Sequence, residues 1–555
     1  MIFKASLPLA IAASVLLTAC NAATGPSPTA SNTEPAVTLA TFSPGRLKAD
    51  VEFLANDLLK GRNTGSEGYL LAANYMAATY KRLGVQPLGE DGGYFQDVAF
   101  ATGQVDTEQS MVSVTVGGET KTLKPVSDYL MFGSVRDTEA EATGDLVFAG
   151  YGIHAPEVGY SDLAELDLNG KIAVIMRSAP EGLGSEIRAH FRSSASKAPT
   201  LEERGAVGMI MIDPLFFSER MTDTRRESFL KRGSFSWTAP EGSDLSVSLA
   251  AAISLNPSEA APLFEGAKMS LDEVMEAKAA GNMPTFPLMA SATIKKTTKL
   301  VDPITSPNVV GLIPGSDPNL RDEYVVLSAH LDHVGTNEKL DGDKIFNGAM
   351  DNATGSSVLL EVARAYMMNG IKPRRSILLL SVTAEEKGLL GAEYFAHFPT
   401  VPVDSLVANV NLDMPILLYK FADVVAFGAE HSSLGPITEA AAAKAGISVT
   451  PDPLPEENLF VRSDHYRFVQ QGIPAVFLMT GFLETEDGRV GGDIFREFLG
   501  THYHKPSDQP DLPIDYEAGA KFAFVNFLIA NEIANADDRP TWNEGDFFGN
   551  IYARD

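Results

Sequence analysis

Two adjacent glutamates, Glu385 and Glu386, stand at the end of the apolar run 377–383, where packing alone does not explain a pair of carboxylates. A carboxylate at the end of a buried strand needs a metal ion, another cation or a proton to offset its lost hydration. Two other apolar runs end similarly: 324–329 leads to His330 and Asp332, and 406–412 leads to Asp413. Because ligands bind beyond the carboxyl ends of strands in open α/β sheets, we interpret these three strand ends as one metal site.

The order of strand-like and helix-like segments predicts the fold class. From residue 299 onward apolar strands alternate with helices, which predicts an α/β fold with a doubly wound sheet, parallel or mixed. The predicted helices are 356–369, 388–397, 435–446 and 516–534. Near the N-terminus, 46–84 has a helical pattern, with a capping box from Thr64 to Glu67 and a stop at Gly84. Short β-like runs separated by turn residues predict an inserted, β-rich domain at 125–298.

The N-terminal residues resemble an export signal. Lys4 precedes an apolar stretch that is too short to span a bilayer and ends in LTAC at Cys20, the chain's single cysteine. This pattern is similar to a lipobox, so we expect 1–19 to be a lipoprotein signal peptide and Cys20 to carry lipid. Asn21, in place of an aspartate, favours the outer membrane, facing the periplasm or the cell surface. The alternative is an ordinary signal peptide with an incidental cysteine.

The remaining boundaries follow from composition. The segments that we expect are a flexible tether at 20–40, a first part of the main domain at 41–124, the insert at 125–298, the main domain at 299–535 and an irregular tail at 536–555. The net charge of −28 argues against binding to nucleic acid or to an anionic membrane, because both would be repelled. We therefore expect membrane attachment through the lipid alone. Oligomeric state is left open.

Five segments carry Asp, Glu or His in positions suited to metal binding. They are 330–332, 350–352, 385–386, 411–413 and 503–508. Imidazole with carboxylates suits zinc better than magnesium or calcium, although manganese and cobalt occupy similar donor sets. Two histidines and three acids are too many for one open tetrahedral zinc, but they suffice for two ions roughly 3.5–4 Å apart that share a carboxylate.

That arrangement leaves one glutamate of the pair free to act as a general base; the alternative is a solvated residue at a helix start. Asp332 can orient His330 as a supporting partner, or it is a surface turn residue. His333 and His502 are interpreted as structural or supporting residues.

The motifs resemble those of the co-catalytic di-zinc aminopeptidases, a family that also contains the glutamate carboxypeptidases. The matching segments are SAHLDHVG (328–335), NGAMDNATG (347–355), TAEEKGLLGAE (383–393), NLDM (411–414), the pair 503–504, and, near the N-terminus, KGRNTGS (60–66) and YFQ (94–96). The insert resembles a protease-associated domain. The resemblance covers nearly all of the chain after the tether.

The resemblance implies a role for each matching residue. It implies that Asp351 bridges two Zn²⁺ ions, that His330 and Asp413 complete one zinc, and that Glu386 and His504 complete the other. It also implies that Glu385 is the general base, that Asp332 supports His330, that Tyr503 hydrogen-bonds the oxyanion, and that Ser463, Asp464 and His465 belong to the substrate pocket. Alternatives are an ordinary aromatic wall for Tyr503 and a buried turn network for the last three.

Two positions depart from the family pattern. Met350 stands where many relatives have an aspartate, which should not cost a ligand, and Pro415 suggests a different loop beside Asp413. The resemblance implies an exported zinc aminopeptidase that acts on peptides. A carboxypeptidase, with Arg462 as anchor of the substrate carboxylate, is the main alternative. A binding module without catalysis and a single-zinc cyclotransferase are disfavoured, because every ligand position is intact.

Overall fold

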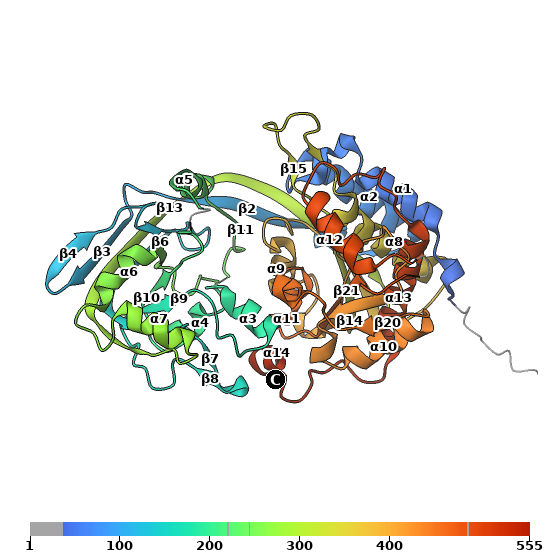
Figure 1. The fold of residues 1–555 in the computed structure, drawn as a ribbon. Helices are drawn as coiled ribbons and strands as arrows, with labels where there is room; N and C mark the ends of the chain where they lie inside the picture. The colour runs from blue at the N-terminus through green and yellow to red at the C-terminus, as the bar shows by residue number, and fades with distance from the viewer. Residues whose placement is uncertain (1–36, 219–220, 244, 486–487, 555) are drawn as a thin grey trace, which may run out of the picture. The chain divides into compact units, whose positions relative to one another are not determined.

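The structure is a computed structural model that describes residues 37–218, 221–243, 245–485 and 488–554 (Figure 1). The predicted signal peptide, Cys20 and most of the predicted tether lie outside the described residues. The described part of the chain forms one compact unit, Val37–Asp555. None of its helices combines the length and the apolar character needed to cross a membrane.

A mixed sheet forms the centre of the fold. Its strands run in the order β11 (Ser234–Trp237), β2 (Phe95–Val105), β13 (Phe286–Ile313), β17 (Ser376–Val382), β14 (Tyr324–His330), β18 (Leu406–Asn411), β21 (Ala475–Thr480), β19 (Asp423–Phe427) and β20 (Ser448–Thr450). β17, β14, β18 and β21 are mutually parallel, whereas β13 and β19 are antiparallel to their neighbours β17 and β21. The predicted α/β class with a mixed sheet is confirmed.

Helices cover this sheet. Every residue of β17 and β18 is buried, so both faces of these strands are covered, since successive side chains point to opposite faces. One group of packed helices comprises α1 (Pro44–Leu54), α2 (Glu67–Leu83), α8 (Thr354–Met368), α10 (Leu434–Lys444) and α13 (Tyr516–Asn535), and another comprises α9 (Leu390–His397) and α11 (His465–Val469). α8, α9, α10 and α13 match the four helices predicted from the sequence.

The start of α2 corrects the predicted capping box. Ser66, not Thr64, is the N-cap, and its hydroxyl accepts from the backbone N–H of Tyr69 at 3.1 Å. Thr64 is buried, and its hydroxyl donates to Oδ2 of Asp332 at 3.1 Å, so it is engaged elsewhere. The predicted stop at Gly84 is confirmed, since this residue adopts φ 82°, which glycine tolerates.

β13 belongs to two ladders at once (Figure 1). Its C-terminal half pairs with β2 and β17, and its N-terminal half pairs with β3 (Met111–Val116) and β6 (Glu139–Phe148). β6 continues into a parallel ladder of β9 (Ile172–Met176), β10 (Gly208–Ile212) and β12 (Ala252–Leu255). The helices of this part are α3 (Ser185–Arg192), α4 (Ala198–Glu203), α5 (Asp223–Arg232), α6 (Pro257–Ala260) and α7 (Leu271–Ala279). The segment 125–298 is therefore joined to the central sheet through β13, and it also contributes β11, which pairs with β2.

The C-terminal segment is more ordered than expected. α14 (Phe547–Tyr552) lies in the predicted irregular tail, where Asp546 caps it and where Phe547 and Phe548 are buried. α12 (Gly491–Thr501) precedes the predicted ligand His504.

Candidate metal centre

Three parallel strands bring the predicted donors to one edge of the sheet. His330 is the last residue of β14 and is paired with Val382, the last residue of β17. Ser328 of β14 is paired with Asn411, the last residue of β18. Glu385, Glu386 and Asp413 follow those strands directly, so the predicted convergence of the strand ends is confirmed.

The first group of donors surrounds His330. Its Nε2 lies 3.0 Å from Oδ1 of Asp413 and 3.3 Å from Oδ1 of Asp351. All three residues are buried. One imidazole nitrogen and two carboxylates thus converge, with their ligand atoms all within 4.8 Å of one another.

The second group shares Asp351 with the first. Nε2 of His504 lies 3.1 Å from Oδ2 of Asp351 and 3.1 Å from Oε2 of Glu386. Asp351 therefore turns one oxygen to each group, as a bridging carboxylate does. The structure brings together all five residues that the sequence predicted as ligands. His504 is the most exposed of them, with 38% of its side chain accessible.

The donor set needs a cation. Oδ2 of Asp351 and Oε1 of Glu386 are buried and have no hydrogen-bond partner among the described residues. Burial alone would raise the pKa of Asp351, but the imidazoles of His333, His330 and His504 hold it well below its usual value. Unpaired, ionised carboxylate oxygens together with imidazole nitrogens, and no thiolate, fit zinc in a catalytic setting.

Asp332 contacts two residues of the site, His330 and Glu385. Its main-chain oxygen lies 3.2 Å from Nδ1 of His330, so the main chain supports this ring in place of the carboxylate. The carboxylate instead accepts from the backbone N–H of Glu385 at 3.1 Å and from Thr64. Asp332 therefore fixes the backbone of the predicted general base.

Glu385 and Tyr503 both line the cavity at the site, and burial changes the pKa of each. Burial, together with the charges of Glu386 and Asp413, raises the pKa of Glu385 well above its usual value. Burial also raises the pKa of Tyr503, so its hydroxyl remains a proton donor. The ring of Tyr503 stacks on that of His504, with centroids 3.9 Å apart.

The predicted substrate-pocket residues separate into two kinds. Ser463 lies at the site and donates to Oδ2 of Asp413 at 2.5 Å. Asp464 and His465 are fully buried and do not line the cavity. Burial raises the pKa of Asp464 to about 8 and lowers that of His465 to about 3, so both are neutral near pH 7.

Two residues that hold the ligand loops were not singled out from the sequence. The buried guanidinium of Arg62 donates to main-chain oxygens of Leu331 (2.9 Å), Asn347 (2.7 Å), Gly348 (3.0 Å) and Leu54. The buried carboxylate of Asp508 accepts from the backbone N–H groups of Met350 at 2.9 Å and Asp351 at 3.1 Å. Both residues lie in segments already noted in the sequence, KGRN for Arg62 and YHKPSD for Asp508. The spacing of residues in these segments does not show that either side chain is buried against the backbone of another segment.

The other positions noted in the sequence also have defined surroundings. His333 is fully buried beside Glu386, whereas Nδ1 of His502 lies 3.0 Å from Oγ of Ser507 in an exposed contact. Met350 is buried, and its sulfur accepts from the backbone N–H of Leu417 at 3.4 Å. No ligand is lost at this position.

A cavity of about 240 Å³ opens onto the donors. Its polar wall contains His330, Asp351, Glu385, Asp413 and Ser463. Its apolar wall contains Leu459, Phe477, Met479, Phe495 and Leu499. The cavity thus places an apolar slot beside the metal-binding groups.

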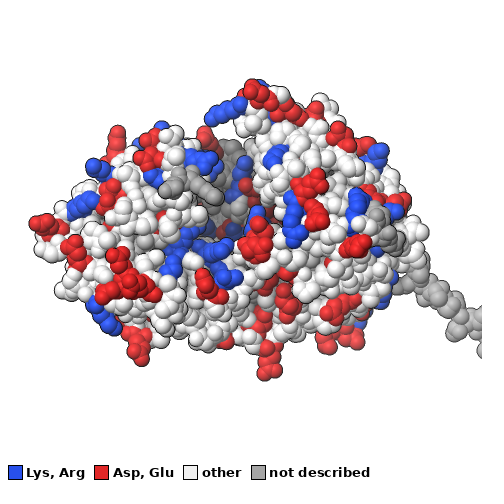
Figure 2. Space-filling model, in the orientation of Figure 1, with Lys and Arg blue, Asp and Glu red and all other residues white. Residues whose placement is uncertain are grey.

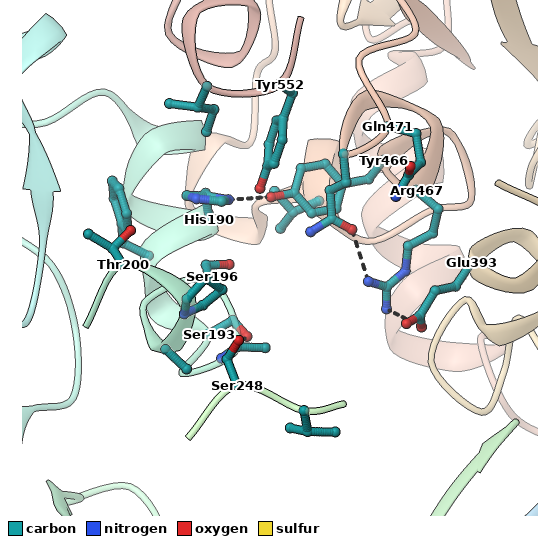
Figure 3. A pocket seen from close by; sticks show the side chains of 18 of the residues that line it. His190, Ser193, Ser196, Thr200, Ser248, Glu393, Tyr466, Arg467, Gln471 and Tyr552 are labelled. Carbon is teal, nitrogen blue, oxygen red and sulfur yellow. Dashed lines mark hydrogen bonds and ion pairs between the residues drawn. The ribbon is translucent and has the colours of Figure 1, made fainter. Parts of the chain in front are cut away.

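A second cavity, of about 750 Å³, lies elsewhere and contains none of the predicted ligands (Figure 3). Nδ1 of His190, from α3, lies 2.5 Å from the Tyr466 hydroxyl, and Arg467 lies 3.6 Å from Glu393. Figure 2 shows Lys and Arg side chains gathered around a hollow in this face, with Asp and Glu spread over the rest. We place the chemistry in the smaller cavity, because only that cavity brings a donor cluster and Glu385 together.

Comparison with known proteins agrees with this site. The model of peptidase family M28 matches residues 308–529, which include all five predicted ligands and Glu385. Aminopeptidase YwaD of Bacillus subtilis is 25% identical over 332 residues, covering 57% of this chain and 65% of that protein. Aminopeptidase NAALADL1 of Mus musculus is 35% identical over 118 residues, covering 20% of this chain and 14% of that protein. The chain thus spans less than two thirds of the length of either relative.

Among solved structures, the aminopeptidase from Aneurinibacillus sp. strain AM-1 is similar with a TM-score of 0.44 and 20% identity, covering 90% of this chain and 96% of that one. BSAP, a zinc aminopeptidase from Bacillus subtilis, is similar with a TM-score of 0.43 and 18% identity, covering 91% and 97%. The resemblance predicted from the motifs is confirmed by the family match: residues 308–529 of this chain match the model of peptidase family M28.

Proposed function

We propose that this protein is a di-zinc aminopeptidase that hydrolyses the N-terminal residue from peptides. The main support for this proposal is that two groups of metal-binding side chains share Asp351 and that Glu385 lines the same cavity. His330 and Asp413 would hold one zinc, and Glu386 and His504 the other. When bound, the two ions would polarise the scissile carbonyl and lower the pKa of a water between them.

Glu385 is the residue placed to move the proton. It lines the cavity, and Asp332 fixes its backbone. A carboxylate there takes a proton from the attacking water and passes it to the leaving amine, which is worth roughly 10²–10⁴ in rate. The Tyr503 hydroxyl, on the same cavity, donates to the oxygen that gains negative charge.

The charge of the cavity favours recognition of a substrate amine. Among the described residues that line it, Arg462 is the sole lysine or arginine, and its guanidinium lies 3.4 Å from Glu457. A paired arginine is a weak anchor for a substrate carboxylate, so this contact favours an aminopeptidase over a carboxypeptidase. The apolar wall suits an apolar N-terminal side chain, for which burial stabilises binding by about 1.5–3 kcal/mol.

The test compares matched peptides that begin with leucine, lysine or aspartate, each with a free or an acetylated N-terminus. We expect chelator-sensitive cleavage of the free peptides alone, fastest for leucine. Equal cleavage of the acetylated peptides would assign a carboxypeptidase. No cleavage by the zinc-loaded protein would favour the binding-module alternative, and Glu385→Gln is the matched control for contaminating peptidases.

We also propose that the protein is exported and held at the outer membrane by lipid on Cys20. The LTAC sequence that ends at Cys20 supports this proposal. Cys20→Ser should move the protein from the membrane fraction to the soluble fraction and abolish labelling with palmitate. Retention of Cys20→Ser in the membrane fraction would contradict it.

We further propose that 125–298 is a protease-associated insert that contacts longer peptides. The second cavity supports this role, since Ser196 of the insert and Tyr466, which follows the Ser463–His465 segment, both line it. Ser196→Trp, which narrows this cavity, should raise KM for long peptides and leave dipeptide cleavage unchanged. An unchanged KM for long peptides would contradict the role.

A further inference from the structure

His333 occupies a position that its interpretation as a structural residue does not explain. Its side chain is fully buried, and its Nδ1 lies 2.7 Å from Oε1 of Glu386 and 3.7 Å from Oδ2 of Asp351. Its ring meets that of His504 edge-on, with centroids 5.7 Å apart. It therefore faces the same three residues that form the second donor group.

The nitrogens of this ring lack partners. The 2.7 Å contact of Nδ1 with Oε1 of Glu386 does not have the geometry of a hydrogen bond, and neither Nδ1 nor Nε2 of His333 has a hydrogen-bond partner among the described residues. Oε1 of Glu386 and Oδ2 of Asp351, the two oxygens nearest to Nδ1, lack one as well. A buried polar group left unpaired costs about 1–3 kcal/mol, so three such atoms facing one another point to a missing common partner. Because two of them are carboxylate oxygens, that partner is a cation.

The ring is also held in a fixed orientation. A Cβ at residue 348 would lie 2.6 Å from Cγ and Cδ2 of His333, so only glycine admits the ring here. The carbonyl of Gly348 is in turn held by Arg62 at 3.0 Å, and the backbone N–H of His333 donates to the Arg62 carbonyl at 3.2 Å. The local backbone thus fixes the orientation of the imidazole beside Glu386.

We propose that His333 is a fourth protein ligand of the second metal, through Nδ1, beside Asp351, Glu386 and His504. This inference rests on the proposed function, since it assumes that the second group binds zinc. The second site then offers two nitrogens and two oxygens, whereas the first offers one nitrogen, from His330, and two oxygens. The two zincs are consequently held with unequal affinity, and the second is the tighter one.

The test measures zinc affinity by competition with a chromophoric chelator and does not depend on activity. In wild-type protein we expect two zincs of different Kd. In His333→Gln we expect the tighter Kd to rise about 100-fold or more, since even partners that only orient a ligand affect metal affinity 10–100-fold. The matched control is His465→Gln: His465 is equally buried, and neither of its nitrogens has a hydrogen-bond partner among the described residues, but its ring contacts those of Phe460 and Phe477. Its zinc affinities should not change.

Thermal unfolding separates a ligand from a structural residue. If His333 is a ligand, His333→Gln should leave the Tm of metal-free protein nearly unchanged and reduce the rise in Tm on adding zinc. A lower Tm in metal-free protein with both zinc affinities intact would overturn the inference and leave the proposed function standing. A wild-type protein that binds no zinc would overturn both.

A second variant covers the case in which His333→Gln fails to fold. In cobalt-loaded His333→Cys, a thiolate ligand should give a near-ultraviolet sulfur-to-cobalt charge-transfer band. Wild-type protein, which contains only Cys20, and His465→Cys should lack it. A folded, cobalt-loaded His333→Cys without this band would overturn the inference.

Discussion

The buried guanidinium of Arg62 stabilises the segments that carry the predicted metal ligands. Its side chain donates to four main-chain oxygens, on Leu54, Leu331, Asn347 and Gly348. Arg62 is only 1% exposed, so Arg62→Met would leave these four acceptors buried without a donor. At about 1 kcal/mol for each acceptor, the low end of the range for buried groups, the free energy of unfolding should fall by ~4 kcal/mol. That is a large share of the ~5–15 kcal/mol available to a domain.

The assay is urea unfolding of metal-free protein, followed by circular dichroism. Arg62→Lys should lose most of the same free energy, because one ammonium cannot replace a fork that reaches several oxygens. The control is Arg496→Met, since Arg496 has 54% of its side chain exposed and should contribute less than about 0.5 kcal/mol. A loss below about 1 kcal/mol for Arg62→Met would show that these four hydrogen bonds do not stabilise the fold as calculated.

Three further predictions concern chemistry and charge. Glu385→Gln should lower kcat about 10²–10⁴-fold with little change in bound zinc, measured by metal analysis and steady-state kinetics; a kcat within threefold of wild type would contradict its role. Prolonged dialysis against a chelator should abolish peptidase activity, and added zinc should restore it; full activity in metal-free protein would contradict zinc dependence. Burial disfavours a charged His431, but the carboxylates of Asp546 (2.6 Å) and Glu186 (2.7 Å) raise its pKa to about 10. The stabilisation by charged His431 should therefore be complete below about pH 6.5 and be lost as the pH rises through about 10. The measurement is Tm against pH, with His431→Gln for comparison. A profile that is the same in this variant as in wild type would contradict the assignment.

The donors of the site could be predicted from sequence because their positions follow from sheet geometry. Parallel strands end at the same edge, so His330, the Glu385–Glu386 pair and Asp413 had to meet once their strands were recognised. Asp351 lies in the short helical segment Ala349–Ala353 and His504 in a turn after α12, and only their motifs indicated that they join the others.

The supporting contacts could not be predicted for a physical reason. Arg62 and Asp508 act on the backbone of segments that are distant in sequence, and backbone acceptors carry no residue-specific signal. The capping error at Thr64 has the same origin, since a tertiary contact with Asp332 competes for the hydroxyl that would otherwise cap α2. For His333 the sequence could not separate the two roles, because a buried structural histidine and a metal ligand have the same local pattern.

The shared strand β13 also makes the two ladders depend on each other during folding. Val105 of β2 pairs with Thr298, and Val112 of β3 pairs with Ile294, so both contacts join residues more than 180 positions apart in the chain. Contacts so distant in sequence form slowly, because the entropy of closing the loop is lost before the contact contributes. Folding of both ladders should therefore be limited by the docking of β13.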